Sequence, residues 1–126
     1  MIFSSIRTFQ LWDFHVSHSR LLIRSPKSTN DLLNQDIIFY GVTHLDLPAT
    51  FFGLDIEQLP DGEAGGKFTP TLGSTTFRLM TTGQACFLAA VACKVLENDL
   101  DLFDSSLEPP YSVRPRGELG RVLARS

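Results

Sequence analysis

The chain has 126 residues, of which 43% are hydrophobic and 20% charged, so it is long enough for one compact domain with a hydrophobic core, and wholesale disorder is excluded. Its charge is uneven: residues 1–108 carry seven Lys or Arg against thirteen Asp or Glu, a net charge of −6, whereas residues 109–126 carry four Arg against one Glu, a net charge of +3. Because binding to phosphate backbones needs clustered cations, the acidic body argues against nucleic acid as the main ligand.

The first predicted element covers residues 9–24, FQLWDFHVSHSRLLIR. Its apolar positions step by two, which is the period of a β-strand. The parity changes between Leu11 and Trp12 and again across residues 17–20, so we expect a bulge or a bend, and two strands rather than one. The cluster SPKSTN at residues 25–30 predicts a turn.

Residues 31–59 are expected to hold two further strands. From Ile37 to Leu47 the chain is rich in β-branched and aromatic residues, and Pro48 ends this strand. The run LDIE at residues 54–57 alternates apolar and acidic side chains, which is typical of a half-solvated strand. The following PDGEAGGK, residues 60–67, predicts a mobile loop between two halves of one domain.

Residues 68–103 contain the longest apolar run of the chain. Alternation predicts a strand with Phe77, Leu79 and Thr81 on one face, and TGQ at 82–84 predicts a hairpin turn. Residues 84–98 have the Ala, Leu, Lys and Glu content of a helix, yet they follow a hairpin signal and include Val, Phe and Cys. We favour a strand here and keep a helix as the alternative. DLDLF, residues 99–103, predicts a short edge strand whose acids oppose edge-to-edge pairing.

The last segment differs in composition from the rest. Residues 109–126, PPYSVRPRGELGRVLARS, contain three prolines, two glycines and few bulky apolar groups. They predict a flexible, Arg- and Pro-containing C-terminal tail that can be removed without loss of the core. The predicted fold is therefore mainly β, or α+β: a single domain over residues 1–108, with a curved antiparallel sheet and at most one or two helices.

Location and cofactors are constrained by what the sequence lacks. No sustained apolar leader opens the chain, and the apolar run of residues 85–93 is far shorter than the ~20 residues of a membrane-spanning helix. We therefore expect a cytoplasmic protein with no membrane partner. Cys86 and Cys93 lie inside the apolar run, which predicts buried, reduced thiols. Lys67 is followed by Phe68, so the glycines before it form no phosphate loop, and no cofactor is predicted.

The three histidines are the candidate ligands for a metal or a substrate. His15 and His18 point to opposite faces of a regular strand, so they cannot chelate together without a bend. His44 and Asp46 share a face of their strand, and a cross-strand partner could be His18. A small-molecule or metal-binding domain, or an enzyme, with a site near His18, His44 and Asp46 is therefore one hypothesis. Because no nucleophile stands beside a positioned base, we expect no enzymatic activity.

Binding to another protein is the leading hypothesis. Trp12 is expected to fill the core, whereas the hydroxyl of Tyr40 needs water or a partner, which makes Tyr40 a candidate contact residue. Asp99, Asp101 and Asp104 alternate with apolar residues and predict one solvated acidic face. Such a face would steer association with a basic protein partner. Together these four residues form the predicted binding site.

Three stretches of the chain resemble a known type of protein. They are FHVSHSRLLIRS (14–25), DIIFYGVTHLDLP (36–48), and the segment from FRLMTTGQ to CKVLENDLDLF (77–103). Together they are similar to small bacterial β-rich proteins of unassigned role, some of them grouped with the immunity proteins of polymorphic toxin systems. The resemblance implies a β-dominated domain that masks a toxin by occlusion, and it carries over no catalytic residues.

Overall fold

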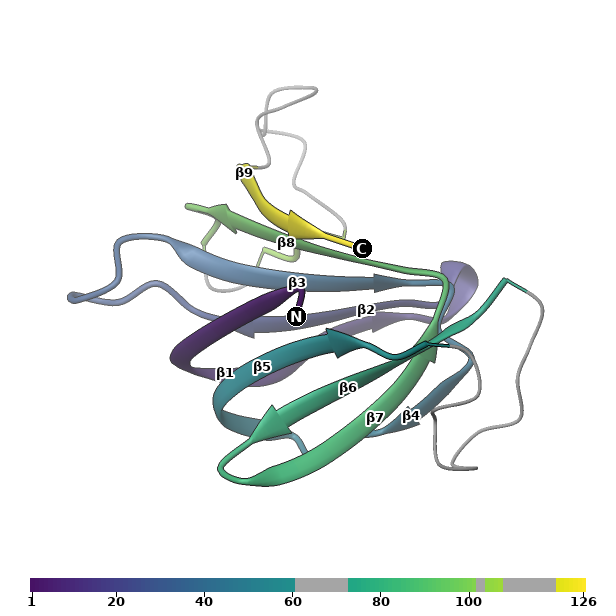
Figure 1. Ribbon diagram of the computed structural model, residues 1–126. Helices are drawn as coiled ribbons and strands as arrows, with labels where there is room; N and C mark the ends of the chain where they lie inside the picture. Colours follow the sequence, from purple (N-terminus) through teal and green to yellow (C-terminus); the bar gives the residue numbers. More distant parts are fainter. Residues whose placement is uncertain (61–72, 102–103, 108–119) are drawn as a thin grey trace.

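The computed structural model describes residues 1–60, 73–101, 104–107 and 120–126. These residues form one antiparallel β-sheet of nine strands with one short 3-10 helix (Figure 1). The expectation of a mainly β single domain with a curved antiparallel sheet is confirmed. Within the described ranges, no helix has the length and apolar character that crossing a membrane requires.

The elements are named here in chain order. They are β1 (Phe3–His15), η1 (Val16–His18), β2 (Arg20–Ser25), β3 (Asn34–Tyr40), β4 (His44–Asp46), β5 (Thr50–Gln58), β6 (Thr75–Thr81), β7 (Gln84–Ala90), β8 (Ala92–Asn98) and β9 (Arg121–Arg125). In the sheet the strands are ordered β4-β7-β6-β5-β1-β2-β3-β8-β9.

Two pairs of strands are near-continuous segments, and they make the sheet close on itself. Three residues separate β3 from β4, and Val91 alone separates β7 from β8. β3 pairs with β8 while β4 pairs with β7, so the segment 34–46 runs alongside the segment 84–98. The circuit of paired strands through β6, β5, β1 and β2 therefore returns to its start, and the sheet curls round on itself (Figure 1).

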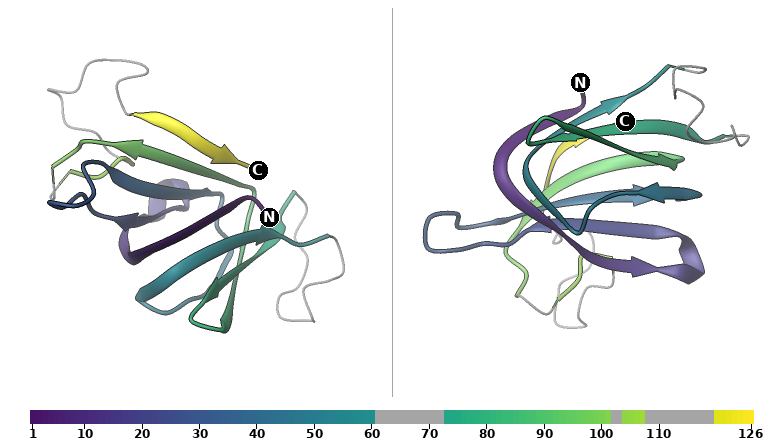
Figure 2. Two further views of the ribbon diagram at one scale, coloured as in Figure 1. Left: turned by 60° about the vertical axis from the view of Figure 1, so that its left-hand side comes forward. Right: turned by 90° about the horizontal axis from the view of Figure 1, so that it is seen from below.

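The long strand β1 connects the two halves of this sheet because it bends. Its last part pairs with β2 and its first part with β5, and the register shifts once in each ladder. An extra residue in one strand of a pair bends that strand and increases its twist. The predicted break between Leu11 and Trp12 is confirmed, since the first shift lies between Leu11 and Asp13. Figure 2 shows the resulting curve of β1 from below.

The main core fills the inside of the closed sheet. Seven strands each contribute a fully buried side chain: Phe9, Ile23, Ile37, Ile56, Phe77, Leu88 and Val95. The rings of Phe39 and Phe77 meet edge to face with centroids 5.3 Å apart, an arrangement that aromatic pairs favour. A smaller cluster of Leu22, Ile38, Leu96 and Leu107 lies on the outer face of β2, β3 and β8.

The ambiguous segment 84–98 is strand, as favoured, with a bend at Val91. This bend packs against Gly41, whose φ is +63° and where an added Cβ would lie 2.6 Å from Val91 Cγ2. A left-handed backbone and a close neighbour both call for glycine there. The predicted hairpin is also confirmed, because Thr82 and Gly83 link β6 to β7 with φ values of +46° and +74°.

Two predictions about the chain beyond β8 are wrong in part. Residues 99–101 of the predicted edge strand form no strand, and residues 102–103 lie outside the described residues. Residues 121–125, assigned to a flexible tail, form β9, which pairs with β8 and packs Leu123 and Ala124 against the main core. The remainder of that tail from 109 to 119, and the predicted loop from 61 to 67, also lie outside the described residues.

Gly120 introduces β9, and it provides a test of how that strand is held. Its φ is +117°, and an added Cβ would overlap the carbonyl oxygen of Glu97 on β8. Gly73 has a φ of +80° but open space around it, so Gly73→Ala is the matched control for backbone strain, expected to cost about 1–2 kcal/mol. We expect Gly120→Ala to lower the free energy of unfolding by more than Gly73→Ala does, and to speed hydrogen exchange at the amides of residues 121–125. Equal melting temperatures for the two variants would contradict a tight β8–β9 contact.

Candidate functional site

The three predicted acidic residues lie on the segment that leaves β8. The side chain of Asp101 is 86% exposed, and its carboxylate lies 3.8 Å from Nζ of Lys27. Nζ of Lys27 also donates a hydrogen bond to the carbonyl oxygen of Asp99, at 2.6 Å. Asp104 is half-buried, and its carbonyl oxygen accepts a hydrogen bond from Arg24. Lys27 therefore offsets part of the acidic charge, and the three residues do not form one strand face.

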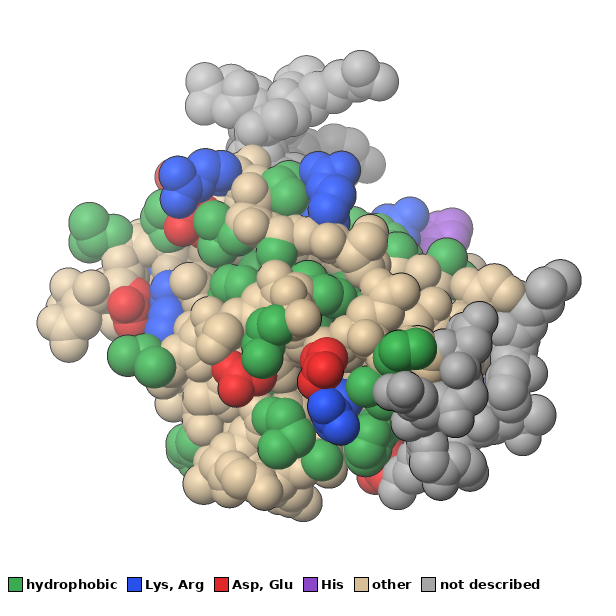
Figure 3. Space-filling view, viewed as in Figure 1, with side chains coloured by type: hydrophobic (Ala, Val, Ile, Leu, Met, Phe, Trp, Pro, Cys, Tyr) green, Lys and Arg blue, Asp and Glu red, His purple; other side chains and the backbone are tan. Residues whose placement is uncertain are grey.

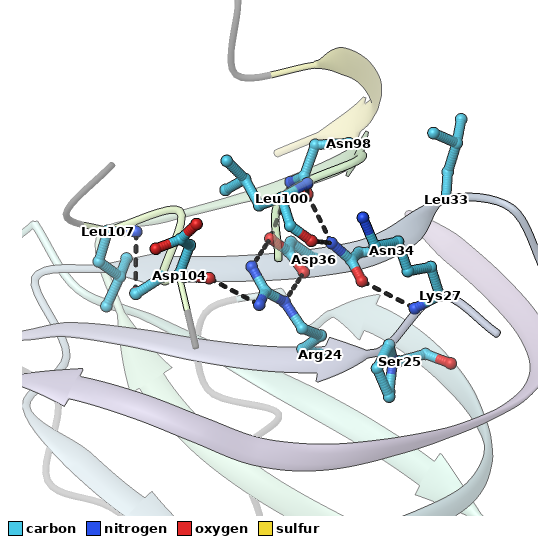
Figure 4. A network of polar contacts seen from close by, with 12 residues as sticks. Arg24, Ser25, Lys27, Leu33, Asn34, Asp36, Asn98, Leu100, Asp104 and Leu107 are labelled. Carbon is cyan, nitrogen blue, oxygen red and sulfur yellow. Dashed lines mark hydrogen bonds and ion pairs between the residues drawn. The ribbon is translucent and has the colours of Figure 1, made fainter. Parts of the chain in front are cut away.

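A buried polar network lies beneath this segment (Figure 4). Arg24 on β2 and Asp36 on β3 form a two-pronged ion pair, with Nε–Oδ1 and Nη2–Oδ2 distances of 2.7 and 2.8 Å. Both side chains are fully shielded from solvent. Asn98 Nδ2 donates to Asp36 Oδ2 at 2.9 Å, and Arg24 Nη1 donates to the Asp104 carbonyl at 2.7 Å. The pair is thus embedded in further hydrogen bonds, as a buried charge pair requires.

Asn34 extends the network to the backbone of the covering segment. Its Nδ2 donates to Asn98 Oδ1 at 2.8 Å and to the Leu100 carbonyl at 2.9 Å, and its Oδ1 accepts from the amide of Lys27 at 2.7 Å. The amide of Leu100 in turn donates to Asn98 Oδ1 at 3.2 Å. Side chains therefore satisfy the backbone groups that a neighbouring strand would otherwise satisfy. This explains why residues 99–101 are ordered across the sheet without being a strand.

This network has a structural role rather than a ligand-binding one. The guanidinium of Arg24 lies 5.3 Å from the ring centroid of Trp12, so its remaining face is also occupied. Arg24 and Asp36 are directly paired across β2 and β3. Sequence reasoning missed them, although a charged residue inside each apolar strand, LLIRS and QDIIF, was the available signal. A group whose partners are all within the protein offers no open position to a ligand.

Tyr40, the fourth predicted contact residue, lies at the end of β3 and is half-buried. Its ring packs against the small outer cluster, and Cζ of Arg20 lies 5.7 Å from the ring centroid. Burial raises the pKa of the Tyr40 hydroxyl; the nearby charges of Arg20 and Arg125 act in the opposite direction. One face of the ring is therefore covered by Arg20.

The histidines are spread over different elements. His18 lies in η1, between β1 and β2, whereas His44 and Asp46 lie on the short edge strand β4. His15 is 3.0 Å from a carboxylate oxygen of Asp13. In the part of the chain that the structure describes, no three His, Cys, Asp or Glu side chains are grouped as a metal ion requires. The hypothesis of a metal site near His18, His44 and Asp46 thus gains no support from the geometry.

A site that sequence reasoning missed lies where β1 pairs with β5. Between the paired residues Ser5 and Thr8, two residues of β1, Ile6 and Arg7, stand opposite Gly53 alone. Gly53 has a φ of +75°, a conformation that glycine adopts without strain. This is a one-residue bulge, and bulges commonly redirect side chains at functional sites.

The bulge sends its two side chains in different directions. Arg7 reaches back to the β2–β3 connection, where Nε donates to Ser25 Oγ and Nη2 donates to the carbonyls of Ser25 and Leu33, each at 3.0 Å. Arg7 thus ties β1 to this connection beyond the end of the β1–β2 ladder. Ile6 is left 99% exposed. Because the bulge directs Arg7 toward the β2–β3 connection, its neighbour Ile6 is directed into solvent.

Phe52 on β5 extends this apolar surface and is 66% exposed. Ile6 and Phe52 border a groove of about 440 Å³, which we name the bulge groove. Its other lining residues come from β1, β5, β6 and the hairpin turn: Ser4, Ser5, Gly53, Leu54, Asp55, Met80, Thr81, Thr82 and Gly83. The available sequence signal was FFG at 51–53, because two successive Phe on a half-solvated strand must place one of them in solvent.

The buried ion pair gives a sharp test of the network. Replacing Arg24 by Met leaves Asp36 charged and buried without its main partner, so we expect a loss of about 3–5 kcal/mol of unfolding free energy. The double variant Arg24→Met/Asp36→Leu should recover much of that loss, because no charge is then buried. Arg78→Met is the control: its pair with Glu57 is more than a third exposed, and we expect a change below about 1 kcal/mol. Urea denaturation measures all three. If Arg24→Met were as stable as Arg24→Met/Asp36→Leu, the role assigned to the ion pair would be contradicted.

The two thiols are free and buried, as predicted. Burial raises the pKa of Cys93 to about 12, and burial together with Asp46 raises that of Cys86. At pH 8 only roughly one Cys93 in ten thousand is a thiolate, the form that reacts. We therefore expect iodoacetamide to label Cys93 in the native protein far more slowly than in urea, with rates read by mass spectrometry. Equal rates in the two conditions would show that the site opens readily.

Comparison with known proteins adds no relative to this description. No family model, no curated protein and no solved structure matches the chain. The function must therefore be inferred from the surfaces themselves: the acidic segment held by Lys27, the surroundings of Tyr40 and the bulge groove. Of these, the bulge groove exposes the most apolar side chains.

Proposed function

We propose that this protein is a non-catalytic protein-binding domain of the toxin-occluding immunity type, and that the bulge groove is its main contact surface. The observation that carries the proposal is the exposure of Ile6 and Phe52, which both line the groove, at 99% and 66%. Large apolar and aromatic side chains that seat in pockets supply much of the binding energy of protein interfaces. Their exposure in the free protein is accounted for if a partner covers them.

The surroundings of the groove suit a protein partner. Over β5 and β6, hydrophobic side chains lie next to acidic and basic ones (Figure 3). Glu57 and Arg78 form an ion pair there, and Ser4 Oγ donates to Asp55 Oδ1 at 2.5 Å. Apolar anchors with polar groups around them are the usual composition of an interface, in which the polar rim gives specificity.

The same lining argues against catalysis in the groove. Among the described residues that line it there is one carboxylate, Asp55, with several hydroxyl groups and no His, Cys or Lys. Asp55 already accepts a hydrogen bond from Ser4. A hydroxyl nucleophile needs a base that is itself oriented by a third group, and the lining supplies no such arrangement. Occlusion of a partner needs only a complementary surface.

Substitution of the two anchors tests the proposal. We expect Ile6→Ser/Phe52→Ser to weaken partner binding by at least roughly tenfold, since both anchors are lost. The matched control is Val16→Ser/Leu32→Ser, which removes two apolar side chains that are 79% and 81% exposed and lie outside the groove. A partner is first isolated from source cells by affinity to the immobilised wild-type protein. Its affinity for the wild type and for each of the two double variants is then measured by titration calorimetry. Equal affinities of the three would place the interface elsewhere.

A further inference from the structure

The described cations divide into two groups. Five of the eight described Lys and Arg side chains have a carboxylate partner, in the pairs Arg7–Asp31, Arg24–Asp36, Lys27–Asp101, Arg78–Glu57 and Arg121–Glu97. The other three, Arg20, Lys94 and Arg125, form no ion pair with a described carboxylate. These three are not scattered: they belong to β2, β8 and β9, close to Tyr40.

The strand register places these residues on one face. Ile38, Lys94 and Arg125 are in register across β3, β8 and β9, and Tyr40 follows Ile38 by two residues on β3. Side chains two apart on a strand share a face. Arg20 lies over the Tyr40 ring, with Cζ 5.7 Å from the centroid. We name Arg20, Tyr40, Lys94 and Arg125 the basic cluster; Lys and Arg side chains over β8 and β9 are visible along the upper edge of Figure 3.

Two further features favour the binding of an anion at the basic cluster. Lys94 and Arg125 stand directly opposite each other on adjacent strands, and like charges in that position destabilise a sheet. Burial raises the pKa of the Tyr40 hydroxyl, and the positive charges of Arg20 and Arg125 act in the opposite direction, so both cations belong to the electrostatic surroundings of that group. A carboxylate bound there would remove the repulsion and accept hydrogen bonds from both guanidinium groups and the hydroxyl.

We propose that the basic cluster binds an Asp- or Glu-rich segment of a protein partner. The inference rests on the proposed function in that the ligand is a protein, but it concerns a different surface from the bulge groove. An acidic peptide fits better than nucleic acid for two reasons. Arg20 covers the Tyr40 ring, so no base can stack on that face, and residues 1–108 carry a net charge of −6, which repels a long polyanion beyond the cluster.

The experiment uses the full chain and a short fluorescein-labelled peptide of alternating Glu and Ser, with binding followed by fluorescence anisotropy. We expect each of Arg20→Gln and Arg125→Gln to weaken binding about fivefold. Arg121→Gln is the matched control: it removes an equal charge from β9, but that side chain is paired with Glu97. Its affinity should stay at the wild-type value, and binding should decline as salt is added.

Several outcomes would overturn the inference. One is absence of peptide binding at low salt; another is an equal loss on Arg121→Gln, which would indicate net charge rather than the cluster. Tighter binding of a DNA oligonucleotide of the same charge would assign the cluster to nucleic acid instead. The Ile6→Ser/Phe52→Ser variant should bind the peptide like the wild type. The two proposals therefore fail separately: loss of the bulge groove's role leaves peptide binding intact, and loss of peptide binding leaves the groove's role intact.

Discussion

The ion pair between Arg24 and Asp36 is the constraint on which the outer face of the sheet depends. Two charges lie on a face that would otherwise meet solvent, and both are fully shielded. Such burial is tolerable only when every remaining donor and acceptor is paired. Asn98 supplies one hydrogen bond, and the Asp104 carbonyl supplies another from the segment that leaves β8. The position of Asp104 beside Arg24 therefore completes the hydrogen bonding of the buried pair.

The closed sheet and the covering segment reinforce each other. The curled sheet wraps its inner face around the main core, and among the described strands only the short β4 and β9 stand at its edges, which limits the exposed strand edge that invites aggregation. The outer face of β2, β3 and β8 then holds a second layer of apolar side chains, which Leu107 helps to cover. The bulge in β1 follows from the same geometry, because a strand that serves both halves of the sheet must bend. The exposed Ile6 is a by-product of that bend that a binding surface can use.

The sequence predicted the strands well because their inner faces alternate. Period two identified both breaks in residues 9–24 and favoured strand for residues 84–98, against the helix propensity of their alanines. It could not predict what depends on long-range contact. Arg24 and Asp36 meet only through the β2–β3 register. The strand β9 depends on the close fit of Gly120 against β8, whereas the composition of residues 109–126 predicts a loose tail. Of the predicted binding residues, Tyr40 lies in the basic cluster, but Asp99 and Asp101 depend on Lys27, which no local pattern connects to them.

The strand β3 has neighbours of opposite charge at its two ends. Asp99 and Asp101 lie near its Asn34 end, and Arg20, Lys94 and Arg125, which form no ion pair with a described carboxylate, lie toward its Tyr40 end. The six steps from Asn34 to Tyr40 in this extended strand span about 20 Å. That length is more than twice the ~8 Å over which salt screens charges under physiological conditions. The two ends therefore do not act on a distant molecule as one dipole. The charges at each end interact with an approaching protein only at close range. The orientation of that protein is therefore selected in the last ångströms before contact rather than during diffusion.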